Sequence, residues 1–249
     1  MSSQPAPGNT ETLPAVLLVH GAHADNSLWS GVILELQAMG VVAIAIANPL
    51  RALAADARYV SNAARQIDGP VLLVGHAYGG AVISNVTDVD NIVGLVFIAA
   101  YAPVEGESAF DLIAQFPETA YGPALAPSSY PNGHGAEAVE MYLSHAKFRE
   151  AFCADLPIGA ANALASLQRP IALAALEDKS GSPAWGVLPS WYLVASEDSL
   201  LHPEAQRFLA NRSDSATTEV AASHAVPLSR PREVARLIFR ALETGDVGD

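Results

Sequence analysis

A strand-to-helix turn carries the strongest chemical signal in the sequence. An apolar run at residues 71–74 leads into the turn. The residues that follow are Gly75, His76, Ala77, Tyr78, Gly79 and Gly80. In a nucleophile elbow the central residue sits on a strained turn with its side chain thrust outward, and glycines beside it let the backbone pack closely. The pattern predicts such an elbow, with Ala77 at the position of the nucleophilic serine.

Two further residues have the types and the chain order that acyl transfer needs. Asp198 follows an apolar run at residues 191–195, and His224 follows a weaker run at residues 217–221. A histidine serves as the base, and a carboxylate orients its ring. The order nucleophile, acid, histidine is the order of the Gly-x-Ser-x-Gly hydrolases. Glu197 competes with Asp198 for the acid role, and Asp198 is favoured.

The elements that must position these residues alternate along the chain. Short apolar runs, typical of strands buried on both faces of a parallel sheet, occupy residues 15–20, 41–47, 71–74, 92–99 and 191–195, with a weaker sixth at 217–221. Helical periodicity occupies residues 27–39, 56–67, 79–86, 203–209 and 231–242. The alternation predicts an α/β fold with a mostly parallel, doubly wound sheet of about six strands.

A long insert interrupts the alternation after the fourth strand. About eighty residues separate the runs at 92–99 and 191–195, more than a crossover needs. The insert has turn residues at 130–133 and helical patterns at 136–144 and 160–167. We predict an α/β core formed by residues 1–102 and 190–249, and a helical cap, residues 103–189, over the carboxyl edge where open α/β sheets hold ligands.

Composition and charge exclude several classes of protein. The net charge of −13 disfavours nucleic acid and anionic membrane surfaces as partners. No apolar run reaches the ~18 residues of a membrane span, and residues 1–13 lack the pattern of a signal peptide, so a cytoplasmic protein is expected. Cys153 is the single cysteine and the histidines lack ligand spacing, so neither a metal nor a cofactor is expected. The oligomeric state stays open, with a homodimer as one alternative.

The chain resembles the α/β-hydrolase superfamily. Within it, the chain is similar to the small esterases that are grouped with plant methylesterases, hydroxynitrile lyases and their bacterial relatives. Those proteins read Gly-His-Ser-x-Gly-Gly at the elbow, where this chain reads Gly-His-Ala-Tyr-Gly-Gly. The resemblance runs from residue 17 to residue 242. It departs from the pattern at Ala77, which lacks the serine hydroxyl.

The resemblance also implies an oxyanion hole. The sequence His20-Gly21-Ala22-His23 follows the first strand. In the group this loop supplies one backbone N–H, and the residue after the nucleophile supplies the other. In this chain the resemblance implies that the two donors are the backbone N–H groups of Ala22 and Tyr78.

With a serine at position 77, the implied chemistry is hydrolysis of a carboxylic ester. His224 would take the hydroxyl proton, Asp198 would orient the imidazolium, and the two N–H groups would hold the oxyanion. The methyl group of Ala77 cannot attack, so we expect this chain to bind ester and to be inactive or nearly so. The apolar and aromatic residues of the insert favour a small hydrophobic ester as the substrate.

Two explanations of Ala77 stay open. The favoured one is an engineered serine-to-alanine change that disables an active carboxylesterase. The other is a natural alanine. The chain is then a pseudo-hydrolase that binds a small ligand, or an enzyme that uses His224 and Asp198 without covalent catalysis, as a lyase or in proton transfer. The fold does not choose among esterase, lactonase, methylesterase and lyase activities.

Overall fold

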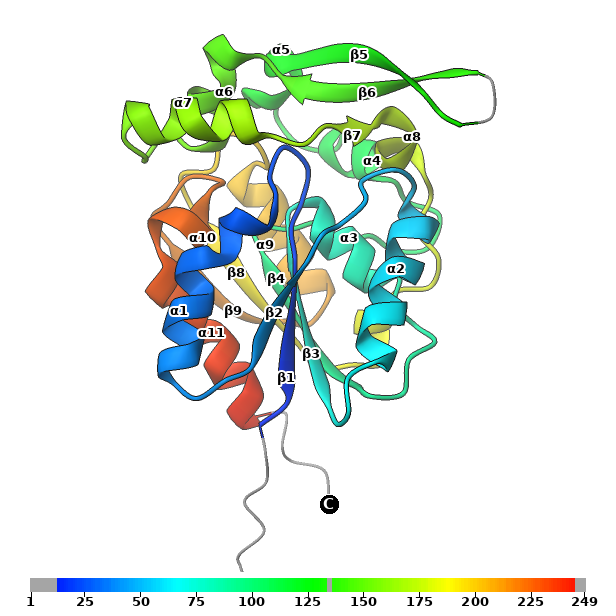
Figure 1. The fold of residues 1–249 in the computed structure, drawn as a ribbon, viewed down its shortest axis with the longest axis vertical. Helices are drawn as coiled ribbons and strands as arrows, with labels where there is room; N and C mark the ends of the chain where they lie inside the picture. Colours follow the sequence, from blue (N-terminus) through cyan, green and yellow to red (C-terminus); the bar gives the residue numbers. More distant parts are fainter. Residues whose placement is uncertain (1–12, 134–135, 245–249) are drawn as a thin grey trace, which may run out of the picture.

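The computed structural model describes residues 13–133 and 136–244. Of residues 1–13, whose sequence lacks the pattern of a signal peptide, all but the last lie outside the described residues. Six strands form one sheet in the order β2-β1-β3-β4-β8-β9, and every pair in it is parallel (Figure 1). The strands are β1 (Ala15–Val19), β2 (Ala43–Ile46), β3 (Val71–His76), β4 (Ile92–Ile98), β8 (Ser190–Ala195) and β9 (Ala216–Val220). The predicted parallel, doubly wound sheet is confirmed, and each expected strand is present.

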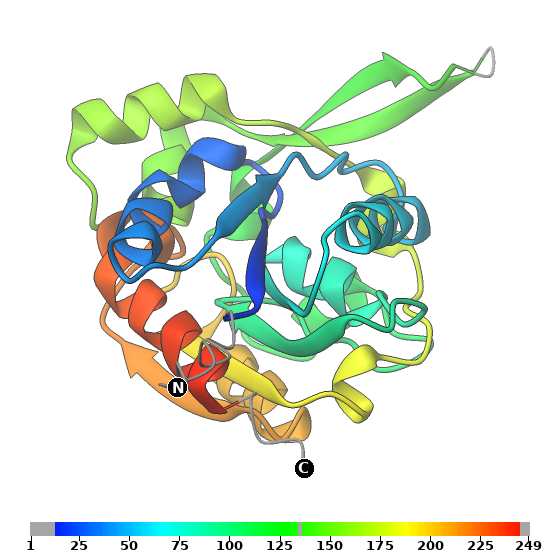
Figure 2. The same cartoon turned by 60° about the horizontal axis from the view of Figure 1, so that its bottom comes forward.

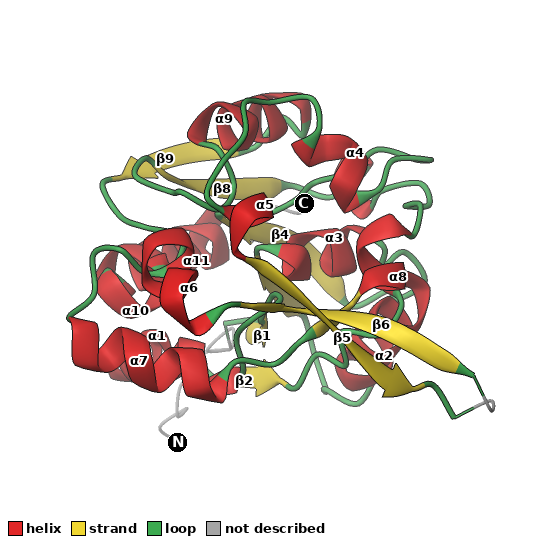
Figure 3. Cartoon of the chain, turned by 90° about the horizontal axis from the view of Figure 1, so that it is seen from above, coloured by secondary structure: helices red, strands yellow, loops and turns green. Residues whose placement is uncertain are grey.

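Helices cover both faces of the sheet, which is why its central strands are continuous apolar runs. Every residue of β3 and β8 is buried. The helices α1 (Ser30–Ala38) and α11 (Pro231–Thr244) pack together on one face, and α2 (Leu53–Arg65), α3 (Tyr78–Ser84) and α9 (Pro203–Arg212) lie on the other (Figures 2 and 3). The short helices η1 (Asn26–Trp29) and α10 (Val226–Ser229) adjoin α1.

Most of the insert, residues 103–189, lies across the carboxyl ends of the strands, and its last segment runs down beside α3 to the beginning of β8 (Figure 1). Its helical segments are α4 (Ala109–Ile113), α5 (Tyr121–Ala124), α6 (His145–Phe152), α7 (Ile158–Leu167), α8 (Leu173–Glu177) and η2 (Ala184–Gly186). It also contains an antiparallel sheet of β5 (Leu125–Pro131), β6 (Glu137–Leu143) and β7 (Ile171–Ala172). The helical pattern at 160–167 is confirmed in α7.

The helical prediction at residues 136–144 was wrong, because this segment is strand β6. It pairs with β5 along its whole length, from Leu125 opposite Leu143 to Pro131 opposite Glu137. Alternate residues such as Val139, Met141 and Leu143 suit a strand as well as a helix of this length. The cross-strand pairing, which a single segment does not reveal, selected the extended form.

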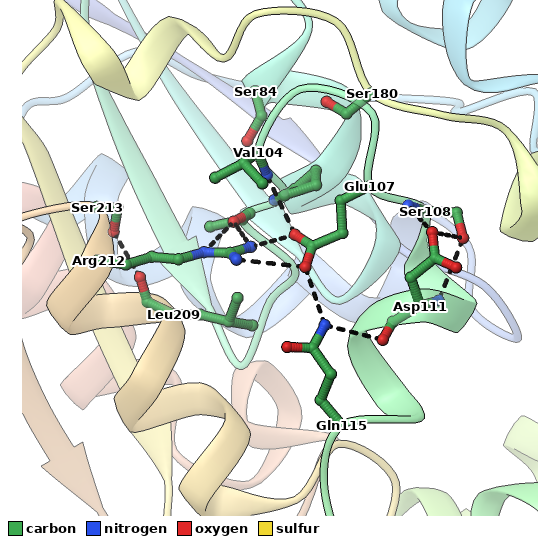
Figure 4. Close-up of polar contacts among 12 residues, drawn as sticks. Ser84, Val104, Glu107, Ser108, Asp111, Gln115, Ser180, Leu209, Arg212 and Ser213 are labelled. Atoms are coloured by element: carbon green, nitrogen blue, oxygen red, sulfur yellow. Dashed lines mark hydrogen bonds and ion pairs between the residues drawn. The ribbon is translucent and has the colours of Figure 1, made fainter.

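A half-buried ion pair ties the beginning of the insert to the core (Figure 4). Arg212 Nη2 lies 2.6 Å from Glu107 Oε2, and Arg212 Nε donates to the carbonyl of Ala102 at 3.1 Å. Glu107 also accepts hydrogen bonds from the Val104 backbone and from Gln115. The last turn of α9 and the segment after β4 are thereby held together below the insert.

Among the described residues, no helix is both long and apolar enough to cross a membrane.

Candidate active site

Ala77 lies on a strained turn between β3 and α3. Its φ and ψ angles are 50° and −121°, a combination that residues with a Cβ rarely adopt and that costs of order 1–3 kcal/mol. Three backbone hydrogen bonds hold the turn: Ala77 N–H donates to Ile98, and the Ala77 carbonyl accepts from Gly80 and Tyr101. This conformation points the side chain away from both elements, as in a nucleophile elbow.

Glycines make the elbow possible by removing side chains at close backbone contacts. A Cβ on Gly79 would lie 2.3 Å from the Val19 carbonyl oxygen, and one on Gly80 would lie 2.4 Å from the Tyr101 carbonyl oxygen. The helix α3 can therefore approach β1 and the segment after β4 more closely than any other residue would allow.

His224 and Asp198 form a buried pair at the carboxyl edge of the sheet. His224 follows β9 and Asp198 follows β8, and His224 Nδ1 lies 2.6 Å from Asp198 Oδ2. Both side chains are almost fully buried. Asp198 Oδ1 accepts the backbone N–H groups of Leu200 and Leu201 at 2.7 and 2.9 Å. These donors offset the cost of burying a carboxylate. Glu197, the competing acid, is exposed.

Gln206 completes the surroundings of Asp198 and was missed by the sequence analysis. Its Nε2 donates to Asp198 Oδ2 at 2.8 Å, and its Oε1 accepts the Ala195 backbone N–H at 2.9 Å. The side chain is fully buried on α9. In the sequence it is one polar residue in an amphipathic helix, and nothing marks it as buried.

The two predicted oxyanion donors lie beside the elbow. Ala22 follows β1, Tyr78 begins α3, and both line one cavity with Ala77 and His224. Within the described ranges, neither the Ala22 nor the Tyr78 backbone N–H donates a hydrogen bond. A Cβ on Gly21 would lie 2.6 Å from the Ala77 Cβ and 3.0 Å from Tyr78 N, so the loop after β1 packs directly on the turn. The role of these N–H groups stays a prediction.

The cavity beside Ala77 is small, with a free volume of about 10 Å³, roughly the space of one water molecule. Residues from the core and from the insert line it together: Ala22, His23, Ala77, Tyr78, Tyr101, Tyr121, Leu176, Leu200 and His224. All of them are buried. Six aromatic residues of the insert favour an apolar pocket by their type: Phe110, Phe116, Tyr121, Tyr130, Tyr142 and Trp185. Of these, Tyr121 alone lines this cavity. Tyr101, which closes another side, follows β4 and had no sequence signal of its own.

Comparison with known proteins identifies the family. A family model described as "Alpha/beta hydrolase family" matches residues 16–237. This chain belongs to the alpha/beta hydrolase family. The comparison with curated proteins finds no match.

Several solved structures share the fold of this member of the alpha/beta hydrolase family. Polyneuridine aldehyde esterase superimposes with a TM-score of 0.79 at 20% identity, over 92% of this chain and 99% of that one. A pyrethroid hydrolase from Sphingobium faniae JZ-2 gives 0.75 at 19% identity, over 93% and 98%. An Arabidopsis methylesterase gives 0.74 at 17% identity, over 93% and 100%.

Three further histidines lie near the candidate site. His76 Nε2 lies 2.8 Å from the carbonyl of His224, and its ring lies 4.7 Å from that of His224. Burial lowers the pKa of His76 well below its ordinary value, and of His20 and His23 to about 4 and about 3. These imidazoles are therefore neutral at pH 7, which leaves no extra positive charge beside His224.

A buried carboxyl lies behind the elbow. The Tyr78 hydroxyl donates to Asp56 Oδ2 at 2.9 Å, and the Arg51 backbone N–H donates to the same oxygen at 3.2 Å. Burial raises the pKa of Asp56 to about 6. The Arg51 guanidinium in turn lies 2.7 Å from Glu140 on β6. The elbow residue Tyr78 is thus connected through Asp56 and the Arg51 backbone to the insert.

Proposed function

We propose that the protein is a carboxylic ester hydrolase of the serine-hydrolase type in which Ala77 replaces the nucleophile. The observation that carries the proposal is the buried His224–Asp198 pair, whose histidine lines the same cavity as Ala77 on the strained elbow, Ala22 and Tyr78. An ester carbonyl in this cavity would lie beside a base and beside two free donors. What is missing is the hydroxyl.

The lining of the cavity supports an apolar ester as the ligand. Leucine, alanine and tyrosine side chains form most of it, and the neighbouring histidines are uncharged at pH 7. An anionic substrate would find no arginine or lysine in this lining. The names of the structural neighbours (an esterase, a methylesterase and a pyrethroid hydrolase) agree with the ester class. In this proposal, residues 103–189 act as the cap that excludes water from the ester.

A serine at position 77 would complete a familiar reaction. His224 Nε2, which makes no hydrogen bond to the described residues, would take the hydroxyl proton, and Asp198 would hold the ring through Nδ1. The oxygen would attack the ester carbon, and the alcohol would leave with the proton from His224. Water would then release the acid by the same route. Loss of the serine in such a site costs roughly 10⁶ in turnover.

The test is Ala77→Ser, assayed with p-nitrophenyl acetate and p-nitrophenyl butyrate. We expect the restored form to hydrolyse at least one ester at least about 10³-fold faster than the unmodified chain. The control is Ala77→Ser combined with His224→Ala, which should return to the rate of the unmodified chain. A folded serine form that gains nothing would contradict the proposal.

A second candidate is non-covalent catalysis by His224 and Asp198. It is favoured by the free Nε2 of His224, which faces a cavity where a methyl group replaces the nucleophile and leaves room for water. Under this alternative the unmodified chain itself hydrolyses p-nitrophenyl acetate above background, and His224→Ala abolishes that rate. Mass spectrometry should then find no acyl-enzyme during turnover.

A further inference from the structure

The loop that carries His224 is held by the insert on both sides of the histidine. Before it, Ser223 donates twice to Asp155: its backbone N lies 3.1 Å from Asp155 Oδ2, and its hydroxyl hydrogen-bonds to Asp155 Oδ1. After it, the Ala225 backbone N–H donates to the carbonyl of Phe152 at 2.9 Å. Phe152 is the last residue of α6, and Asp155 lies between α6 and α7. In Figure 1 these two helices lie above α10, the helix that follows the histidine.

The core holds the same histidine through different atoms. The His224 carbonyl lies 2.8 Å from Nε2 of His76, at the end of β3, and His224 Nδ1 lies 2.6 Å from Asp198 Oδ2. The ring also meets the Phe152 ring edge to face, with centroids 5.4 Å apart. The imidazole therefore owes its orientation to Asp198, to Phe152 and to the backbone of the loop that carries it.

Asp155 is suited to hold this loop because it is ionised and its own segment is braced. Burial raises the pKa of Asp155, but hydrogen bonds, chiefly from Ser223, outweigh burial and lower the pKa on balance. An ionised acceptor makes stronger hydrogen bonds than a neutral one. Arg149 braces the segment, since its Nε donates to the Leu156 carbonyl at 3.1 Å and its Nη2 to the Ala154 carbonyl at 2.8 Å. The carboxylate thus meets the loop from a turn that is itself fixed by hydrogen bonds.

The position of this contact gives it a consequence beyond stability. Ser223 is buried and directly precedes His224, so a shift of its backbone moves the imidazole. Misplacing a catalytic group by about 1 Å can cost on the order of 10²-fold in rate. Asp155 is not among the residues that line the cavity beside Ala77. Any effect of Asp155 on the reaction must therefore pass through the histidine and not through contact with an ester.

We propose that Asp155 is a positioning residue, which holds Ser223 and thereby keeps the imidazole of His224 in place against Asp198. The inference rests on the proposed function for the reaction that His224 serves. The insert then does more than cover the site, because the end of α6 supports the base. This part of the insert stays on the core during the reaction, since lifting it would release the loop on both sides of the histidine.

Proton NMR of the unmodified chain tests the positioning without any turnover. The proton shared by His224 Nδ1 and Asp198 gives a low-field signal, which is assigned by its absence from His224→Ala. We expect Asp155→Ala to speed the exchange of this proton with water by at least about tenfold, because a released loop opens more often. The matched control is Glu150→Ala, an exposed carboxylate on α6, which should leave the exchange unchanged. No such signal in the unmodified chain, unchanged exchange in Asp155→Ala, or equal increases in both variants would overturn the inference.

Two milder variants separate the hydrogen bonds from the negative charge. Asp155→Asn can accept the Ser223 N–H and donate to the Ser223 hydroxyl, so its exchange should stay close to that of the unmodified chain. Ser223→Ala loses the hydroxyl contact and keeps the N–H contact, so it should exchange at an intermediate rate, and it serves as the test if Asp155→Ala does not fold. Exchange as fast in Asp155→Asn as in Asp155→Ala, or unchanged in Ser223→Ala, contradicts positioning by these hydrogen bonds.

The effect on turnover is measured in the Ala77→Ser form, with the p-nitrophenyl ester that it hydrolyses. Adding Asp155→Ala should lower kcat by at least about tenfold and leave KM within about threefold, because the base is disturbed and the cavity lining is not. Adding Glu150→Ala should change neither constant. An unchanged kcat, or a loss confined to KM, refutes the role of Asp155 in turnover. If the Ala77→Ser form is inactive, the proposed function fails, whereas faster proton exchange in Asp155→Ala still upholds the positioning of His224.

Discussion

Gly79 is the residue whose substitution tests the elbow most directly. A methyl group there would lie 2.3 Å from the carbonyl oxygen of Val19, a backbone atom of the central sheet that cannot move aside. We expect Gly79→Ala to lower the free energy of unfolding by at least about 3 kcal/mol in urea denaturation. The matched control is Gly159→Ala in α7, where nothing lies within 4 Å, and where alanine should stabilise the helix by about 0.5–1 kcal/mol. Equal effects of the two substitutions would refute the close-packing argument.

At the scale of elements, the ion pair between α9 and the beginning of the insert should matter for stability. Arg212 and Glu107 are 16% and 12% exposed, whereas Arg207 and Glu219, one turn away on α9 and on β9, are 48% and 44% exposed. Arg212→Met leaves a half-buried carboxylate without its cation, so we expect a loss of about 2–4 kcal/mol in the free energy of unfolding. Arg207→Met should change it by less than about 1 kcal/mol. Similar losses for both variants would mean that burial of the pair is not what stabilises it.

At the scale of the whole molecule, buried histidines and one buried carboxyl act on stability in opposite directions. His20 and His23, with pKa values lowered to about 4 and about 3 by burial, exclude protons that the unfolded chain binds below pH 6.5. The free energy of unfolding should therefore fall as pH drops from 6.5 towards 4. Burial raises the pKa of Asp56 from 3.8 to about 6, so between these values the folded chain keeps a proton that the unfolded chain releases. The contribution of Asp56 to the free energy of unfolding therefore rises as pH falls from 6 towards 4.

Asp56→Asn separates the two effects. The variant lacks the carboxyl that opposes acid destabilisation, so its stability should fall more steeply than that of the unmodified chain between pH 7 and pH 4. The extra fall should be about 2–3 kcal/mol, from a shift of about two pKa units. Urea denaturation at a series of pH values measures it, with Asp68→Asn on the surface as the control. Parallel profiles for Asp56→Asn and the unmodified chain would show that Asp56 does not titrate as described.

The sequence by itself determined the sheet, the order of its elements and the positions of the candidate site residues. A strand buried on both faces is a continuous apolar run, and the glycines of an elbow have a fixed spacing. Both patterns can therefore be recognised in a short stretch of sequence. Ala77, Asp198 and His224 could be predicted to lie together although they are far apart in the sequence. All three follow strands of one parallel sheet, whose carboxyl ends meet at one edge.

Only the tertiary structure decided which residues surround that site. Gln206 became a partner of Asp198 because α9 packs on β8, and Tyr121 met His23 because the insert lies over the sheet. Strand β6 formed because β5 was available to pair with it. Each of these contacts joins segments whose proximity no local pattern records. Burial and pairing depend on what packs against a segment, and that partner is specified elsewhere in the chain.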